Sequence, residues 1–364
     1  MDEVELAQEL MKFDTTSPVT DPDIMEFLER FLQVEGIDTE IRDIDGVKNL
    51  VATTGSGDTS ICFNGHLDVV PPESGWEVTE PFEPVVKDGR LYGRGAADMK
   101  AAAAAQVMAF TDLHDNPSFE GELTLMLAGD EEQGGFKGTK PMVEDMPSFD
   151  YAVVGEPTDL NIQVGTRGVF WLTVFLEGEP AHAARPEAGT NVLERVPEII
   201  KKLQKLEMEY EPDAKLPDPS FTVTGVETDM TQNSIPGEAL IQVDARYLPS
   251  QNPASIVKRV RDLLTDNGVD ARVEVIDHGG AFKLDDDRFQ RIATEVLTEV
   301  RGEEPRHITE GGASDGRFFA ARGTPFIELG VNQEPGHTTD EYCSVESVSQ
   351  LREAYRGIAK RLTG

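Results

Sequence analysis

The segment "ELTLMLAGDEEQGG", residues 122–135, decides how this sequence is interpreted. Its apolar half has the length and composition of a buried strand, and two adjacent glutamates, Glu131 and Glu132, follow it. Successive strand residues point to opposite faces, so the two carboxylates share one site only where the chain leaves the strand. The two glycines that follow permit such a departure. In so acidic a chain the two glutamates could also be ordinary solvent-exposed residues at a strand end. The positions of the other acids and histidines must distinguish a shared site from this alternative.

The composition limits the classes of partner. The chain has 364 residues, a length that favours two domains, with 68 acidic residues against 33 Lys and Arg and a formal net charge of −35. Nucleic acid and anionic membrane surfaces are excluded as expected partners, because phosphate recognition requires clustered basic residues. The acid is spread along the whole chain, which favours a highly charged surface adapted to a halophilic cytoplasm. An ordinary acidic protein is the alternative.

The sequence has no feature typical of an exported or membrane-anchored protein. Cys62 and Cys343 lie far apart and without metal-type spacing, so we expect neither a disulfide framework nor a cysteine zinc site. Residues 1–13 form an acidic amphipathic pattern rather than a signal peptide, and no apolar run approaches 18 residues. We therefore expect a cytoplasmic protein.

Strands and helices alternate in the first part of the chain, which predicts an α/β fold with a mainly parallel sheet. An Ala-rich segment starting at Asp98 has the strongest helix propensity in the chain, and Asp98 is a good cap. The predicted helices and strands lie at about 2–13, 21–35, 49–53, 60–65, 122–128 and 151–155.

The pattern changes after about residue 167 and returns to the first pattern after about 279. Strand, helix, two strands, helix and strand follow one another, with helices expected at 190–208 and 253–267, which is typical of a compact α+β unit. We therefore expect a domain at 167–278 inserted into a catalytic domain formed by 1–166 and 279–364.

Acids and histidines follow several of the predicted strands. Ligands in open α/β sheets gather beyond the carboxyl ends of strands, so these side chains are expected at one edge. His66 offers an imidazole to a metal, and Asp68, two residues on, can orient it. A helix cap is the alternative role of Asp98. The remaining candidates of this kind are Glu131, Glu132, Glu156 and His337.

So many carboxylates at one edge would repel one another unless cations lay among them. Two zinc ions resolve this repulsion if Asp98 bridges them. The first ion would bind His66 and Glu156, and the second His337 and Glu132. Glu131 then remains free to take a proton from the attacking water and to deliver it to the leaving amine.

Five motifs carry a resemblance to a known family. "GHLDVVP", "GRGAADMK", "DEEQGG", "VVGEPT" and the late "GH" resemble the co-catalytic zinc aminoacylase and carboxypeptidase family, in the branch of the succinyl-diaminopimelate desuccinylases and acetylornithine deacetylases. The resemblance covers nearly the whole chain. It implies a two-zinc catalytic domain, in which cobalt can substitute, and an inserted lid domain that forms a homodimer. The roles expected from it match those given above for the ligands, Asp68 and Glu131.

The resemblance also implies residues that act on the substrate. His182 matches a lid histidine that reaches the partner's site and binds the scissile carbonyl oxygen, although alone it fits an exposed loop histidine. Asn233 and Arg246 match a substrate-facing pair, although a turn Asn and a sheet-face Arg fit the sequence as well. The further substrate-binding candidates are Arg167, Gly312, Ser314 and Arg317.

Two departures affect the substrate assignment. "GGASDGRFF" at 311–319 most resembles the desuccinylase branch, but Ala313 replaces a Thr, and Arg185 replaces the usual Tyr of the lid motif. The best expectation is removal of an acyl group from an N-acylated amino acid, with N-succinyl-LL-2,6-diaminopimelate as the substrate. An acetylornithine-type deacetylase or a dipeptidase of the same family is the alternative. A noncatalytic metal-binding scaffold would be favoured by an inert residue at Glu131 or at a ligand position, and none occurs.

Overall fold

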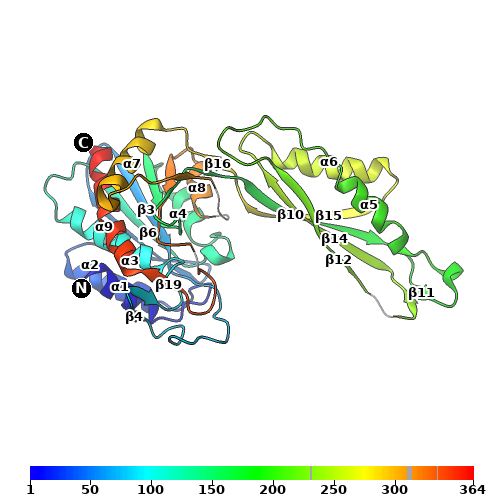
Figure 1. The fold of residues 1–364 in the computed structure, drawn as a ribbon, viewed down its shortest axis with the longest axis horizontal. Helices are drawn as coiled ribbons and strands as arrows, with labels where there is room; N and C mark the ends of the chain where they lie inside the picture. Colours follow the sequence, from blue (N-terminus) through cyan, green and yellow to red (C-terminus); the bar gives the residue numbers. More distant parts are fainter. Residues whose placement is uncertain (230–231, 310–313, 334) are drawn as a thin grey trace. The chain divides into compact units, whose positions relative to one another are not determined.

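The chain forms two compact units. The computed structural model describes residues 1–229, 232–309, 314–333 and 335–364. Unit 1 contains residues 1–164 and the described residues from 284 onward, and unit 2 contains the described residues of 165–283. Both termini belong to unit 1 (Figure 1). The assignment of the second unit as a lid stays a prediction.

Unit 1 is built on an eight-stranded sheet with the order β1-β2-β6-β3-β7-β18-β8-β17. The four central strands, β6, β3, β7 and β18, are mutually parallel. The antiparallel pairs are β1 with β2, β2 with β6 and β8 with β18, and β17 pairs parallel with β8. This confirms the predicted α/β class with a mainly parallel sheet. The strands are β1 (Thr39–Ile44), β2 (Val47–Gly55), β3 (Ser60–His66), β6 (Glu122–Ala128), β7 (Tyr151–Val154), β8 (Ile162–Gln163), β17 (His307–Ile308) and β18 (Phe326–Glu328).

Helix α3 (Lys100–His114) packs against α1, α9, β3 and β6. Its alanines at 101–105 are completely buried, so small side chains allow the helix to lie close to the sheet. The expected start at Asp98 is wrong by two residues, because Met99 is the N-cap and makes no side-chain capping bond. The other helices of unit 1 are α1 (Glu3–Met11), α2 (Asp23–Val34), α4 (Thr139–Asp145), α7 (Asp287–Arg301), α8 (Gly316–Ala321) and α9 (Val345–Thr363).

Strand β6 explains the apolar run that precedes the glutamate pair. It lies between β2 and β3, and every residue after Glu122 is buried, so apolar side chains are required on both faces. The chain then turns into the short 3-10 helix η1 (Glu131–Gln133). Gly134 and Gly135 have φ angles of 100° and 63°, a region that favours glycine. The predicted departure from the strand is therefore present.

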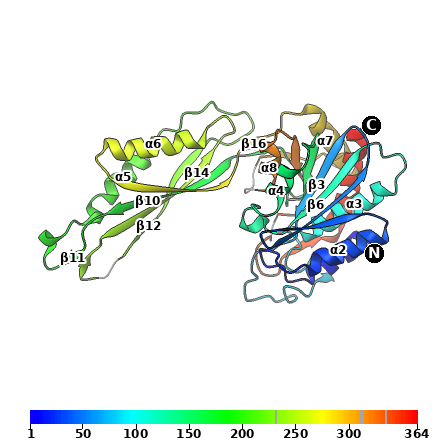
Figure 2. The same ribbon diagram turned by 180° about the vertical axis from the view of Figure 1, so that it is seen from behind.

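Unit 2 contains a four-stranded antiparallel sheet with the order β12-β14-β10-β15. Helices α5 and α6 lie along one face of this sheet (Figures 1 and 2), and alternate side chains of β10 pack beneath them. The helix predicted at 190–208 is shorter, because Pro197 lacks an amide proton and fits only the first helical turn. The elements are β10 (Gly168–Glu177), α5 (Val196–Leu203), β12 (Ser220–Thr228), β14 (Glu238–Tyr247), α6 (Pro253–Asp266) and β15 (Ala271–Gly279).

Short elements complete both units. In unit 1, β19 (Tyr342–Ser344), β5 (Arg90–Tyr92) and β4 (Val85–Lys87) form a small antiparallel sheet. Within the parts of the chain that the structure describes, none of the helices combines the length and the hydropathy that a bilayer-crossing segment needs. The short elements of unit 2 are β9 (Gly165–Thr166), β11 (Ala181–His182), η2 (Pro186–Ala188), η3 (Val192–Glu194), β13 (Ser234–Ile235) and β16 (Phe282–Lys283).

Candidate metal centre

The carboxyl ends of three neighbouring parallel strands supply most of the candidate site. His66 is the last residue of β3, Glu132 lies on η1 just after β6, and Glu156 follows β7 by two residues. Parallel strands end at one edge of a sheet, so these three side chains start from adjacent positions. Asp98 precedes α3, and His337 lies in the loop between β18 and β19.

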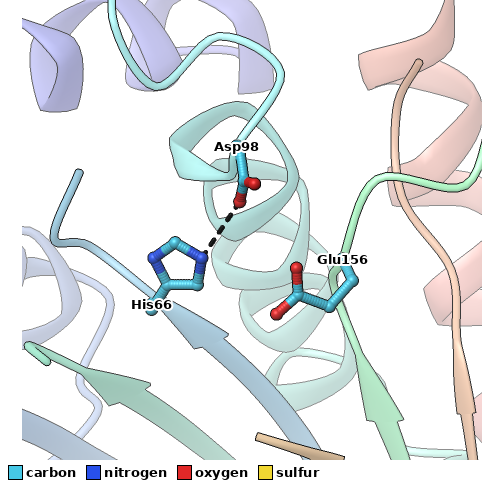
Figure 3. Close-up of side chains that lie close together, drawn as sticks. All are labelled: His66, Asp98 and Glu156. Atoms are coloured by element: carbon cyan, nitrogen blue, oxygen red, sulfur yellow. Dashed lines mark hydrogen bonds and ion pairs between the residues drawn. The ribbon is translucent and has the colours of Figure 1, made fainter. Parts of the chain in front are cut away.

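The first group of ligand-type side chains is His66, Asp98 and Glu156. Their ligand atoms all lie within 4.8 Å of one another, and the three side chains point toward a common space (Figure 3). The His66 Nε2 atom is 3.0 Å from Asp98 Oδ1. His66 is only 1% exposed, so this group is largely removed from bulk solvent.

The second group is Asp98, Glu132 and His337, again with ligand atoms within 4.8 Å of one another. The His337 Nε2 atom is 3.1 Å from Asp98 Oδ2 and 3.0 Å from Glu132 Oε1. Asp98 therefore belongs to both groups and directs one oxygen to each histidine. This arrangement replaces the alternative role of Asp98 as a helix cap.

The pKa values in this cluster reflect crowding of charge. Burial opposes protonation of His66, but hydrogen bonds to Asp68 and Asp98 outweigh it and raise its pKa well above the ordinary value. Hydrogen bonds to Asp98 and Glu132 raise the pKa of His337 to about 10. Burial raises the pKa of Glu156 strongly, and the neighbouring carboxylates of Glu131 and Asp98 add to this effect. Protons on these groups thus compensate the clustered negative charge.

Metal cations would compensate the same charge more completely. Imidazole nitrogen and carboxylate oxygen are ligands that suit zinc, and each group offers one histidine and two carboxylates. Among the described residues, Glu156 Oε1 is a buried carboxylate oxygen without a hydrogen-bond partner. A buried oxygen of this kind carries a desolvation cost that a bound cation removes. The residues present therefore fit a pair of cations that share Asp98.

Glu131 lies beside the two groups without belonging to either. Its Oε2 atom is 4.0 Å from His66 Nε2, and its side chain is 12% exposed. Burial raises its pKa well above the ordinary value, against the attraction of His66 and with the repulsion of Asp315. A carboxyl group whose pKa is raised keeps its proton to a higher pH than an ordinary carboxyl group, which suits a residue that accepts and then releases protons.

Asp68 contacts both His66 and the backbone of η1. Its backbone carbonyl, rather than its carboxylate, makes the closer contact with His66 Nδ1, at 3.0 Å against 3.5 Å. The carboxylate accepts hydrogen bonds from the backbone N–H groups of Glu131 and Glu132, at 3.1 and 3.0 Å. The Ser17 hydroxyl also donates to it, at 2.6 Å. Asp68 therefore fixes the position of η1.

Two of the substrate candidates lie in unit 1. Arg317 donates to the backbone carbonyl of Gly134, at 2.7 Å, directly after η1. Ser314 is buried, and its hydroxyl donates to Glu328, so it supports the sheet. Gly312 and the adjacent Ala313 lie outside the described residues.

The remaining substrate candidates lie in unit 2. His182 and Asn233 are neighbours, because β11 pairs with β13 and the N–H of Ala183 donates to the Asn233 carbonyl at 2.9 Å. Both side chains are exposed. Arg246 makes a bidentate pair with Asp244, at 2.8 and 3.0 Å, so its charge is already compensated. Arg167 donates to the backbone carbonyl of Asp218 at 2.8 Å.

Sequence analysis missed three residues that support the site. Ser17 and Glu341 were not considered, although Glu341 follows His337 within four residues. Asp315 was quoted as part of "GGASDGRFF" but given no role. It is 2% exposed, and burial raises its pKa. An acid inside a motif of small residues, directly before helix α8, is the signal that could have identified it.

The fold and the site together define a metal-dependent hydrolase that acts on an amide bond. The sequence model described as peptidase family M20/M25/M40 matches residues 62–361, so the chain belongs to this family. The predicted family resemblance is thereby confirmed. The chain is 31% identical to a succinyl-diaminopimelate desuccinylase of Thioalkalivibrio sulfidiphilus, over 99% of both chains. It is 32% identical to the enzyme of the same name from Halorhodospira halophila, over 99% of this chain and 98% of the relative.

Solved structures share the fold at lower sequence identity. An M20 family metallo-carboxypeptidase of Sulfolobus solfataricus has a TM-score of 0.84 at 18% identity, with 99% of both chains covered. A dinuclear metal binding peptidase of Bacillus subtilis has a TM-score of 0.73 at 16% identity, with 99% of this chain and 97% of that chain covered. At these identities the likeness concerns the fold.

Proposed function

We propose that this protein is a two-zinc amidohydrolase that removes the acyl group from an N-acylated amino acid. The observation that carries the proposal is the Asp98 carboxylate, whose two oxygens contact the histidines of two separate ligand-type groups. The similar peptidase of Bacillus subtilis is described as binding a dinuclear metal centre, which supports the same assignment here. Cobalt is the expected substitute for zinc.

Each ion would have its own set of ligands in addition to the shared Asp98. His66 and Glu156 would hold one ion, and His337 and Glu132 would hold the other. When bound, the ions supply Lewis acidity that polarises the scissile carbonyl group and acidifies the attacking water. His66 is buried and the three carboxylates are partly buried, so these groups lie in a medium of lower polarity than water, whereas His337 is exposed.

Glu131 is assigned the proton transfers. Its carboxylate takes a proton from the attacking water and later delivers it to the nitrogen of the leaving amine. The hydrogen bond from its backbone N–H to Asp68 supports this role, because it fixes the start of η1 without engaging the Glu131 side chain. The raised pKa of Glu131 favours the protonated form that the second transfer requires.

The proposed substrate is N-succinyl-LL-2,6-diaminopimelate, which places the enzyme in lysine biosynthesis. Full-length relatives named succinyl-diaminopimelate desuccinylase support this choice. Arg317, beside η1, and Arg167 are the preferred candidates for substrate carboxylates, whereas Arg246 must first release Asp244. An acetylornithine-type deacetylase is the alternative, because Ala313 and Arg185 depart from the desuccinylase motifs. The proposed contacts that complete the site are Asn233, Gly312 and Ser314.

We further propose that unit 2 acts as a lid and forms a homodimer. His182 would then donate to the scissile carbonyl oxygen in the partner's site, where negative charge develops. Its exposed position in unit 2, beside Asn233, supports such a role. The net charge of −35 supports a halophilic cytoplasm as the location.

A panel of substrates tests the proposed function. Protein stripped with a chelator and reloaded with zinc or cobalt is assayed with N-succinyl-LL-2,6-diaminopimelate, N-acetylornithine and a dipeptide, at low and high salt. We expect hydrolysis that requires the metal and is fastest for the succinyl substrate. Fastest hydrolysis of N-acetylornithine would move the assignment to the alternative, and hydrolysis of none would contradict the proposed function.

A second test concerns His182. His182→Ala and Glu131→Ala chains are each expected to be inactive as homodimers. Refolded together in equal amounts, they should give about half heterodimers with one intact site of two, and so roughly a quarter of wild-type activity. Heterodimers confirmed by mass that remain inactive would remove the role of His182 in the partner's site.

A further inference from the structure

Glu341 is a buried acid that binds the loop in front of Asp98. Its side chain has no exposed surface, and it follows His337 by four residues. One carboxylate oxygen, Oε1, accepts three hydrogen bonds from backbone N–H groups of a single loop. The donors are Gly95 at 3.1 Å, Ala97 at 2.8 Å and Asp98 at 3.1 Å.

The other carboxylate oxygen of Glu341 forms an ion pair with the guanidinium of Arg94, at the start of the same loop. Arg94 is 1% exposed, so both charges are removed from water. In addition, the backbone carbonyl of Glu341 accepts the N–H of Gly93 at 2.9 Å. Such pairs often contribute little to stability, because desolvation offsets their attraction. The geometric effect of Glu341 is larger. Its three hydrogen bonds through Oε1, its ion pair with Arg94 and its backbone bond from Gly93 together fix the 93–98 loop.

The 93–98 loop carries Asp98, and the segment that contains Glu341 follows His337. These two residues, Asp98 and His337, are in close contact. Asp98 ends the loop, and His337 lies just before Glu341 in the chain, with its Nε2 atom 3.1 Å from Asp98 Oδ2. The next residue toward His337, Asp340, accepts hydrogen bonds from the N–H groups of Glu77 and Val78, both at 2.9 Å. The 340–341 segment is therefore anchored to the surrounding loops on both sides.

We propose that Glu341 is a positioning residue for the metal centre, which holds Asp98 between His66 and His337 through the backbone of the 93–98 loop. The inference rests on the proposed function, since it assumes that Asp98 binds cations. Groups outside the ligands that orient them commonly contribute strongly to metal affinity. Because Asp98 would serve both ions, loss of this anchor should weaken both sites together.

The test is zinc binding to metal-free protein, measured by competition with a chelator, together with the absorption spectrum of the cobalt form. In Glu341→Gln the amide oxygen still accepts N–H groups but lacks the charge. We expect both zinc dissociation constants to rise by about 10–100-fold and the cobalt bands to shift, as for other residues that orient ligands.

Glu3→Gln is the matched control. Glu3 is also a buried acid paired with an arginine, Arg352, at 2.8 Å. Arg352 contacts Asp112 near the end of α3 that lies opposite Asp98. This variant loses the same kind of charge and should bind zinc like the wild type.

The outcomes separate the inference from the proposed function. A wild-type protein that binds no zinc would contradict the proposed function, whereas a folded Glu341→Gln protein with wild-type zinc affinity would overturn only the role of Glu341. The single variant leaves the charge of Arg94 buried without a counter-charge. If this prevents folding, the double variant Arg94→Met/Glu341→Gln, which also removes the charge of Arg94, is used for the same zinc measurement. If neither variant folds, Glu341 maintains the fold rather than the ligand, and the positioning role is withdrawn.

Discussion

Asp68 can orient His66, and it can fix the position of η1 (Glu131–Gln133) through backbone N–H groups. Replacing Asp68 with Asn separates these two roles. The amide has the same shape, but it has one acceptor oxygen where the carboxylate has two. That carboxylate receives the N–H groups of Glu131 and Glu132 and the hydroxyl of Ser17. The contact between His66 Nδ1 and Asp68 at 3.0 Å uses the backbone carbonyl, which the substitution leaves in place.

The expected cost follows from these contacts. At least one N–H group of η1 loses its charged acceptor, which costs about 1.5–3 kcal/mol of the free energy of unfolding. Because η1 carries Glu131 and Glu132, a small displacement should lower kcat by about 10–100-fold. The ion at Glu132 should bind more weakly, while the ion at His66 keeps its affinity.

The assay combines denaturant unfolding, kcat and a zinc titration against a chelator. Asp150→Asn is the control, since Asp150 accepts two hydrogen bonds from Ser60, at 2.8 and 3.0 Å, at the opposite end of β3. We expect one of two zinc-binding steps to weaken in Asp68→Asn and neither in the control. An Asp68→Asn protein with wild-type stability and turnover would refute the reasoning.

Three further predictions address the acids and the surface. Glu131→Ala should abolish turnover while both ions stay bound, and Glu132→Ala should lose metal; equal metal content and equal residual rates in the two would contradict this division. Burial raises the pKa of Glu328 from 4.5 to about 7, so its stabilising effect is complete below pH 4.5 and is lost as the pH rises to about 7. Glu328→Gln should therefore reduce the fall in stability between pH 4.5 and 8 by about 3 kcal/mol, measured by denaturant unfolding, and an unchanged pH dependence would count against it. The acidic surface predicts folding and activity that persist above about 1 M salt, where charges are screened within about 3 Å, and a stability maximum in dilute buffer would contradict this.

The central sheet could be predicted from the sequence because its signals are local. Apolar runs such as 122–128 and the Ala-rich helix each have one physical interpretation, and their alternation favours parallel pairing. Strand β2 was predicted at 49–53, but not its antiparallel pairing with β6. Strand β1 and the small sheet of β4, β5 and β19 were missed. Their polar and short sequences become strands only through partners elsewhere in the chain.

Most of the ligand-type residues could be predicted because they lie at or just after the end of a strand, or just before a helix, whereas His337 lies in the loop between β18 and β19. The orientation of Asp68 could not, since a carboxylate and a backbone carbonyl of one residue compete for the same imidazole. Likewise, the pairing of Arg246 with Asp244 depends on two side chains that share a sheet face, a contact that the motif does not specify. The role of Glu341 could not be predicted, because its partners are backbone N–H groups about 245 residues away in sequence, at Gly95, Ala97 and Asp98.

The most direct test of the central claim, that two cations share Asp98, is anomalous diffraction at the zinc edge from crystals of the zinc-loaded protein. We expect two peaks roughly 3.5–4 Å apart. One should lie against His66 and Glu156, the other against His337 and Glu132, and both against Asp98. A single peak at saturating zinc, or two peaks of which one lacks contact with Asp98, would contradict the account.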